Sequence, residues 1–331
     1  MQYIDDRIAA HEENSSWVQD VMSFAALDEM AVSDFLGCFC TDRKTGVGSI
    51  KLPDWAFAAK DKTYQDKRAE VMRERAWQDD MSLAGIMHLE LIAHDAYKRS
   101  LHHQWLSALD NLAAEGNGIK MLDYGSGASS FTELALSYPN ISSTLADVDP
   151  GVVEYLRHKY AKWNGRVDVL ALPSAAKIST RARVKVDYRC ISGQFDAIVA
   201  ADVLEHALDP LGALLHLLDC LKPGGIALIN YPHYIEGDWH TPEAFYLRRW
   251  CFALLRATCR RASEVVWKKR AGAIAFAGSV MFRAARPILC ARSRAFTRDY
   301  FKEHGNELVE TVRTKAHREV TVEELIRSVN G

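Results

Sequence analysis

The sequence predicts an α/β protein whose core is a doubly wound, mostly parallel sheet, with a helical N-terminal extension and a helical C-terminal tail. Two observations predict the core. Short apolar segments of strand composition alternate with helical segments between Ile119 and Tyr231, and this alternation is typical of parallel strands covered by helices on both faces. The first of these strands also runs into a glycine-containing turn, MLDYGSGASS, at Met121–Ser130. Such a turn before a helix is a ligand-binding feature.

Three regions follow from the pattern along the chain. Residues 1–115 show no strand alternation and are predicted to be a mainly helical extension that caps the substrate side of the core. Residues 116–286 are the predicted core. Residues 287–331 are the predicted tail, which contains a charged helical pattern at Val320–Val329.

Within the extension, the sequence predicts a break at Thr41–Gly48 and a charged stretch at Lys60–Asp80. The clearest helix of this region comes last, because four apolar residues recur there at helical spacing before a Gly-Asn-Gly break. These residues are Leu101, Trp105, Leu109 and Leu112.

The core elements are predicted in alternating order. They are strand Ile119–Tyr124, helix Ser130–Ser137, strand Ser143–Asp147, helix Gly151–Tyr160, strand Ala197–Ala201, helix Leu211–Leu221 and strand Ile226–Tyr231. The third strand has two alternatives, Arg166–Leu172 or Val184–Tyr188, and the segment not chosen becomes an insertion.

After the core strands, Glu264–Lys268 and Ala275–Arg283 are predicted to pair as an antiparallel hairpin that closes the sheet. A rival interpretation makes Ala271–Phe282 a helix lying on a membrane surface, beside the basic residues of Trp267–Arg270. That apolar run is shorter than the roughly 20 residues that a membrane-spanning helix needs. No integral membrane segment is therefore expected, and peripheral membrane contact stays open.

Composition indicates a soluble, cytoplasmic enzyme. The 331 residues include 41 basic and 43 acidic ones, a net charge of -2, which provides no general attraction to nucleic acid. The seven cysteines contain no C-x-x-C pair and are expected to be reduced thiols. The start of the chain has neither a basic segment nor an apolar run, so no secretion signal is expected. Oligomeric state is not predicted.

The turn Asp123-Tyr124-Gly125-Ser126-Gly127 resembles motif I, D-x-G-x-G-x-G, of the class I S-adenosylmethionine-dependent methyltransferases, with Ser129 in place of the third glycine. Asp147 ends the next strand 24 positions after Asp123, and FDAIVAADVLEHALDP at Phe195–Pro210 and LKPGG follow in the family's order. The region is similar to the small-molecule and quinone-type O-methyltransferases. This resemblance implies a seven-stranded, Rossmann-like sheet. A nicotinamide-dependent oxidoreductase is disfavoured because the G-x-G-x-x-G spacing is absent.

The resemblance implies S-adenosylmethionine as the cofactor. Asp147 would hold both ribose hydroxyls, since a carboxylate offers two acceptor oxygens. Asp187 would accept a hydrogen bond from adenine only if Val184–Tyr188 is the third strand. The complete set of predicted cofactor-binding residues is Asp123, Tyr124, Gly125, Gly127, Asp147, Val148, Asp187 and Asp202.

His240 is the predicted general base, with His233 and Asp238 as its predicted partners. It precedes a helix that Thr241 caps and Pro242 begins, and the positive end of a helix favours a neutral imidazole. The expected reaction is methyl transfer to a hydroxyl of a small molecule, without a metal. An ion at Asp202, Glu205 and His206 resembles a metal group of some quinone-pathway relatives and stays an alternative.

Other acceptors also stay open: carbon or nitrogen methylation, and acceptors on a saccharide or lipid carrier. A non-catalytic module that binds the cofactor is the alternative of another class, and the serine in the third glycine position is the feature that favours it.

Overall fold

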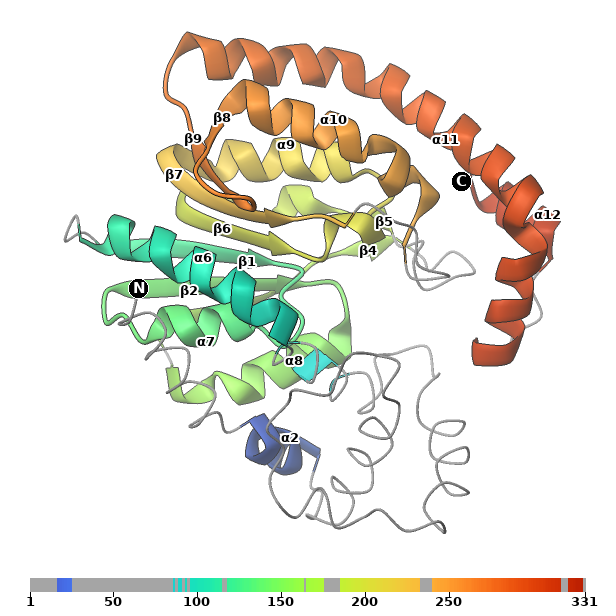
Figure 1. Ribbon diagram of the computed structural model, residues 1–331. Coiled ribbons are helices and arrows are strands. Elements are labelled where there is room, and N and C mark those ends of the chain that lie inside the picture. Colours follow the sequence, from blue (N-terminus) through green and yellow to red (C-terminus); the bar gives the residue numbers. More distant parts are fainter. Residues whose placement is uncertain are drawn as a thin grey trace. The chain divides into compact units, whose positions relative to one another are not determined.

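The computed structural model describes residues 17–25, 86, 89–90, 93, 96–114, 118–163, 165–175, 185–232, 240–316 and 321–329 (Figure 1). Its main sheet has seven strands in the order β3-β2-β1-β6-β7-β9-β8. This mostly parallel sheet with flanking helices confirms the predicted fold class.

The pairings agree with a parallel sheet that ends in antiparallel strands. β1 pairs with β6, β2 with β3 and β6 with β7, all parallel, whereas β9 is antiparallel to both β7 and β8. The strands are β1 (Ile119–Tyr124), β2 (Ile141–Asp147), β3 (Val167–Ala171), β6 (Phe195–Ala201), β7 (Leu221–Asn230), β8 (Cys259–Arg261) and β9 (Val266–Lys269). A separate antiparallel pair consists of β4 (Ser174–Ala175) and β5 (Lys185–Val186).

The chain divides into two compact units, the first unit (Met1–Ile119 with Ser126–Ala171) and the second unit (Lys120–Gly125 with Leu172–Gly331). The described helices of the first unit are α2 (Trp17–Ala25), α6 (Ala96–Ala113), α7 (Ser130–Leu136), α8 (Pro150–Lys159) and the 3-10 turn η3 (Ala161–Trp163). Those of the second unit are α9 (Pro210–Cys220), α10 (Pro242–Thr258), α11 (Ala273–Ala316), α12 (Val322–Ser328) and the 3-10 turns η4 (Tyr188–Cys190) and η5 (Leu204–His206).

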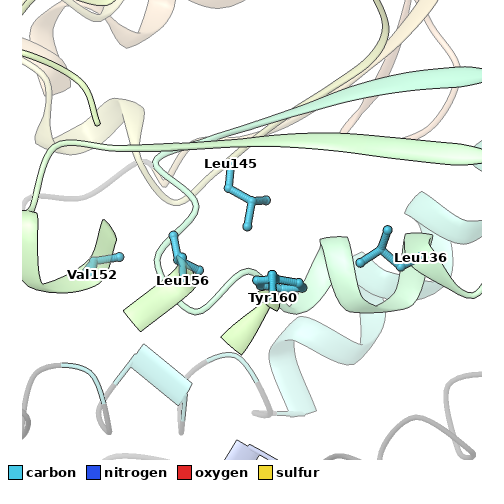
Figure 2. Packing of buried hydrophobic residues seen from close by; sticks show 5 residues of the cluster. All are labelled: Leu136, Leu145, Val152, Leu156 and Tyr160. Carbon is cyan, nitrogen blue, oxygen red and sulfur yellow. The ribbon is translucent and has the colours of Figure 1, made fainter. Parts of the chain in front are cut away.

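The first unit has a core between β2 and the two helices on either side of it in the sequence, α7 and α8. Val152 and Leu156 of α8 and its C-cap residue Tyr160 are four residues apart, and they pack with Leu145 of β2 and Leu136 of α7 (Figure 2). The predicted helix before β1 is α6, and its residues Leu101, Trp105 and Leu109 are buried as their spacing predicts. The predicted segments Thr41–Gly48 and Lys60–Asp80 lie outside the described residues.

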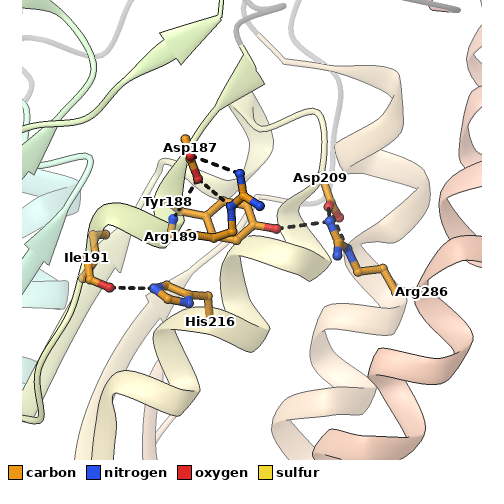
Figure 3. A network of polar contacts seen from close by, with 7 residues as sticks. All are labelled: Asp187, Tyr188, Arg189, Ile191, Asp209, His216 and Arg286. Carbon is orange, nitrogen blue, oxygen red and sulfur yellow. Dashed lines mark hydrogen bonds and ion pairs between the residues drawn. The ribbon is translucent and has the colours of Figure 1, made fainter.

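The third-strand alternative is decided in favour of the earlier segment. Val167–Ala171 pairs in parallel with β2, whereas Lys185–Val186 pairs only with β4. Val184–Tyr188 as third strand of the main sheet is therefore wrong. Asp187 instead caps η4, and its carboxylate accepts hydrogen bonds from the backbone and guanidinium N–H groups of Arg189 (Figure 3). These bonds lower the pKa of Asp187. The predicted hydrogen bond from adenine to Asp187 depended on Val184–Tyr188 being the third strand, so that prediction no longer has a basis.

The predicted closing hairpin is half correct. β9 covers most of the first predicted strand and is antiparallel, but its hairpin partner is the preceding strand β8, and Ala275–Arg283 belongs to α11. The first turns of α11, Ala273–Ala285, include five alanines, and alanine is the strongest helix former. The buried residues Ala275, Phe282 and Leu289 of α11 recur every seven residues, which is two helical turns and not the alternation of a strand. The helix continues through Pro287, so the predicted boundary between core and tail at residues 286 and 287 lies inside one helix.

Candidate active site

The glycine turn has three residues in the left-handed backbone region. Gly125 and Gly127 have φ of 64° and 50°, and Ser129 has φ of 59° although it carries a side chain. Ser129 takes the N-cap position of α7, but its side chain makes no cap hydrogen bond. A non-glycine residue in this region costs about 1–2 kcal/mol. The turn therefore keeps the backbone geometry of a three-glycine motif without its third glycine.

Within the first unit, the end of α8 holds this turn in place. The Lys159 ammonium donates to the Ala128 carbonyl at 3.0 Å, and the Tyr160 hydroxyl donates to the Ser129 carbonyl at 2.8 Å. Both side chains are buried. Two side-chain hydrogen bonds to adjacent carbonyls fix the orientation of the peptide groups on either side of Ser129.

Asp147, the predicted ribose ligand, ends β2 beside the glycine turn. Its Oδ2 accepts the N–H of Gly127 and its Oδ1 accepts the N–H of Asp149, both at 3.0 Å. Burial raises the pKa of the Asp147 carboxyl, and the N–H groups of Asp149 and Gly127 partly offset this rise. Each oxygen keeps lone-pair capacity beyond its backbone bond, so two hydroxyl groups can still donate to this carboxylate. Val148 follows as a half-buried residue.

In the second unit, β1 ends with buried Asp123 and Tyr124 and then Gly125. A Cβ on Gly125 would lie 2.1 Å from Cγ2 of Val203. Glycine is therefore required here for two reasons, the positive φ and the Val203 side chain, which occupies the space that a Cβ needs. The predicted cofactor contact of Gly125 stays a prediction.

Asp202 follows β6 and is the second non-glycine residue of the described chain with a positive φ, 54°. Its backbone N–H donates to the Asn230 carbonyl at 3.2 Å, and the Asn230 amide donates to its carboxylate. Asn230 ends the neighbouring strand β7. The half-buried Asp202 carboxylate is therefore oriented by a residue that the sequence interpretation did not name.

His240 lies with Glu205 and His206 in one cluster of the second unit. The ligand atoms of the three side chains are all within 4.8 Å of one another, and the two imidazole rings are 5.3 Å apart in an edge-on arrangement. Glu205 and His240 are buried, with 3% and 8% exposed. The Nε2 of His206 is 3.9 Å from Oε1 of Glu205.

Thr241 explains why this cluster forms. Its N–H donates to the Glu205 carbonyl at 2.8 Å, and its hydroxyl donates to the Ala207 carbonyl at 3.0 Å. The same hydroxyl accepts the N–H of Ala244, so Thr241 caps α10 as predicted. This residue therefore joins the start of α10 to η5 and brings His240 to Glu205. The other two predicted catalytic residues, His233 and Asp238, lie outside the described residues.

The family described as a methyltransferase domain matches residues 97–265, half of the chain, and this range includes the glycine turn, β2 and the cluster at His240. The chain belongs to the class I S-adenosylmethionine-dependent methyltransferases.

The relatives of this methyltransferase are distant. It is 26% identical over 142 residues to a highly reducing polyketide synthase of Preussia isomera, covering 40% of this chain and 5% of the relative. It is 28% identical over 156 residues to a ubiquinone biosynthesis O-methyltransferase of Xanthomonas campestris, covering 46% and 58%. The chain thus spans less than two-thirds of either relative. A solved O-methyltransferase family protein from Burkholderia thailandensis shares 15% identity over 63% of this chain and 68% of its own, with a TM-score of 0.40.

The turn of this methyltransferase fits the cofactor that its family uses. Ser126 is buried, and among the described residues its Oγ has no hydrogen-bond partner. Buried polar atoms are normally satisfied, and an unsatisfied one is typical of a position where a ligand or water completes the bond. Ser126 lies between the two glycines and is followed by Gly127, which bonds Asp147. A polar group of the cofactor would therefore find a donor and an acceptor in the first unit.

The sequence interpretation missed the residues that support the turn. Glu90 is fully buried and accepts a 2.7 Å hydrogen bond from Lys159, which also lies 3.3 Å from Glu133. The signal for Lys159 was weak, because a lysine near the end of a helix is ordinarily exposed. Glu90 comes from a part of the extension whose pattern indicated only helix.

Ser129→Gly tests whether the third position of the turn is strained. Glycine adopts a positive φ without the steric cost that Ser129 bears. We expect the change to leave stability equal or raise it by up to about 1 kcal/mol, because the added freedom of the unfolded chain offsets part of the relief. Urea unfolding would measure this, with Ser137→Gly at the right-handed C-cap of α7 as the control that should destabilise. A marked loss of stability in Ser129→Gly would contradict the strain.

Proposed function

We propose that this methyltransferase transfers a methyl group to a hydroxyl of a small molecule, with His240 as the general base. The observation that carries the proposal is the cluster of buried His240 and Glu205 with half-buried His206. A carboxylate close to an imidazole stabilises the imidazolium that forms when the histidine takes a proton. Glu205 thus takes the supporting role that the sequence assigned to His233 and Asp238.

Each residue has one role in this proposal. In the first unit, Asp147 and the N–H groups of the glycine turn would hold the ribose of S-adenosylmethionine. In the second unit, Asp202, which follows β6, is a predicted cofactor ligand. When bound, S-adenosylmethionine would supply a methyl group on a positively charged sulfur, and His240 would take the proton of the acceptor hydroxyl.

A hydroxyl acceptor is favoured by two points. The relative in Xanthomonas campestris is named an O-methyltransferase of ubiquinone biosynthesis, and a hydroxyl, unlike a neutral amine, gains from a base during transfer. Incubation with S-adenosylmethionine and a panel of phenols, catechols, amines and enols, with products identified by mass spectrometry, tests the proposal. O-methyl ethers are the expected products. Methylation confined to nitrogen or carbon would overturn the hydroxyl assignment.

Asp147→Ala tests the cofactor assignment. We expect S-adenosylhomocysteine to bind more weakly by roughly 1.5–3 kcal/mol, the range for hydrogen bonds to a charged group. Isothermal titration calorimetry measures the change, and Asp168→Ala, at an exposed position of β3, is the matched control with unchanged affinity. Equal affinities for Asp147→Ala and the wild type would mean that Asp147 is not the ribose ligand.

The raised pKa of Asp147 adds a pH dependence. Ribose hydroxyls donate to the ionised carboxylate, so affinity is complete above the folded-state pKa and falls as pH decreases through it. Because that pKa is raised, the loss should begin above the usual aspartate range of about 3.9. Titrations at decreasing pH should show this loss in the wild type and not in Asp147→Asn, whose amide does not titrate.

A further inference from the structure

The N-terminal part of α11 has a broad apolar face that is exposed. Seven residues form this exposed face of α11: Ile274, Phe276, Ala277, Val280, Met281, Ala284 and Ile288. Five of them recur at alternating intervals of three and four residues, so they follow one side of the helix, and the other two widen it. Ile274 and Phe276 are each 73% exposed, Met281 is 56% and Ile288 is 62% exposed. A contiguous apolar surface of this kind typically marks an interaction site.

The opposite side of α11 attaches it to the second unit. Ala275, Phe282 and Leu289 are buried there, and α11 runs along α10 (Figure 1). The two helices come close at Gly278, where a Cβ would lie 3.1 Å from the Cβ of Ala257. The exposed face is therefore held outward by packing on the other side of the same helix.

The segment of sequence that includes the exposed face has only basic charged residues. From Val265 to Arg298 the sequence has no Asp or Glu and eight basic residues, although the whole chain has a net charge of -2. The basic residues are Lys268, Lys269, Arg270, Arg283, Arg286, Arg292, Arg294 and Arg298. Apolar side chains beside lysine and arginine fit a surface of anionic lipid. The apolar side chains can insert among the acyl chains, and the basic side chains can bind the anionic headgroups.

By length and composition, the stretch Ala273–Glu307 of α11 could also cross a membrane, and 17% of its most apolar window is buried. Two ion pairs argue against crossing. Arg283 pairs with Asp219 on α9, and Arg286 pairs with Asp209, the N-cap of α9 (Figure 3). A spanning helix would break both pairs, leave α10 and bring two arginines into hydrocarbon, where each is costly. A helix held along its length on one side favours an orientation in the membrane plane.

A second copy of the chain fits this face less well. Pairing two such faces would bring together two segments that have eight basic residues each and no acidic residue of their own. Two of the eight, Arg283 and Arg286, pair with aspartates outside the segment. Like charges placed opposite one another disfavour association. An anionic lipid surface, by contrast, attracts the exposed basic residues, such as Lys268, Arg292 and Arg294.

We propose that the exposed face of α11 binds the surface of an anionic membrane, with the helix lying in the membrane plane. The inference does not depend on the identity of the methyl acceptor. It turns the open alternative of peripheral membrane contact into a defined surface on one helix.

Vesicle co-sedimentation of the full chain tests the proposal. The wild type should pellet with vesicles of phosphatidylcholine and phosphatidylglycerol, much less with phosphatidylcholine alone, and high salt should weaken the binding. Phe276→Ser with Met281→Ser should reduce the partition coefficient about tenfold or more, since apolar burial supplies the interfacial affinity. Phe276→Leu with Met281→Leu is the matched control that keeps binding. All these side chains are exposed, so circular dichroism should show unchanged folding.

Charge-reversal variants provide a second test of the proposal. Lys268→Glu with Arg292→Glu, both exposed, should reduce binding to anionic vesicles about tenfold or more. Lys162→Glu with Lys120→Glu, both at exposed positions outside α11, changes the net charge equally and should bind as the wild type does.

Four results would overturn the proposal. The first is a wild type that binds neither vesicle, and the second is a serine double variant that binds as the wild type does. The third is a chain that sediments as a dimer which the serine variant dissociates, without vesicle binding, because this assigns the face to a second copy. The fourth is resistance of the bound protein to alkaline carbonate extraction, which would show a spanning helix instead of an interfacial one.

Discussion

Lys159→Met is expected to lower the free energy of unfolding by about 3–5 kcal/mol, the usual cost of removing one partner of a buried ion pair. Lys159 and Glu90 are 2% and 0% exposed, and their side chains are 2.7 Å apart. Burial lowers the pKa of Lys159, but Glu133 and Glu90 raise it by more, so it lies above the usual lysine value. The ammonium therefore stays charged at neutral pH, and its removal takes the positive partner from the buried Glu90 carboxylate, which keeps the hydrogen bond from the Tyr155 hydroxyl. Urea unfolding measures the change.

Two variants sharpen this experiment. Lys162→Met removes an exposed lysine three residues later, and surface changes of this kind usually stay within about 0.5 kcal/mol. Adding Glu90→Gln to Lys159→Met should restore part of the stability, because the buried negative charge is then removed together with its ammonium partner. Because the pKa of Lys159 is raised, its contribution is complete below the unfolded-state pKa of about 10.4 and is lost at still higher pH. Equal midpoints for Lys159→Met and the wild type would contradict the role of this network.

His240→Gln is expected to reduce turnover about 10²–10⁴-fold, the contribution typical of a positioned general base. Affinity for S-adenosylhomocysteine should stay near that of the wild type, because the proposed cofactor ligands are Asp147 and the glycine turn. A comparison of kcat with calorimetric affinity separates the two effects. His216→Gln is the control, since His216 bonds the Ile191 carbonyl (Figure 3) and has no proposed part in the chemistry.

The same cluster also provides a donor set of one carboxylate and two imidazoles, which suits a divalent transition metal. If His240 acts as a base, a chelator should leave turnover unchanged. Loss of activity in the chelator with recovery on adding a divalent ion would instead assign His240, Glu205 and His206 as metal ligands. Normal turnover of His240→Gln would eliminate both roles.

Some local features could be predicted from the sequence with the correct residue at each boundary. β1 has the predicted bounds Ile119–Tyr124, and Thr241 caps α10 with Pro242 in its first turn. Both depend on residues a few positions apart, such as a strand that ends in glycine or a hydroxyl that accepts the N–H three residues later. The order of elements and the family follow from a series of such signals.

Two secondary-structure assignments could not be made from local sequence, because each depended on which distant element the segment packs or pairs with. Val167–Ala171 and the segment that includes Lys185–Val186 both have strand composition, and only pairing with β2 shows which belongs to the main sheet. Ala275–Arg283 has apolar residues that suit either a buried strand or a helix. The packing of one side of α11 against α10 shows that the segment is a helix.

By itself, the sequence determined the family, the order of strands and helices and the aspartate that ends β2, because these follow from short motifs and from periodicity. The tertiary structure decided which distant residues meet: Lys159 with Glu90, 69 positions away, and His240 with Glu205 through the backbone bond of Thr241. It also decided which side of α11 stays exposed. Such contacts are set by how elements pack in three dimensions, and neither local composition nor spacing specifies that packing.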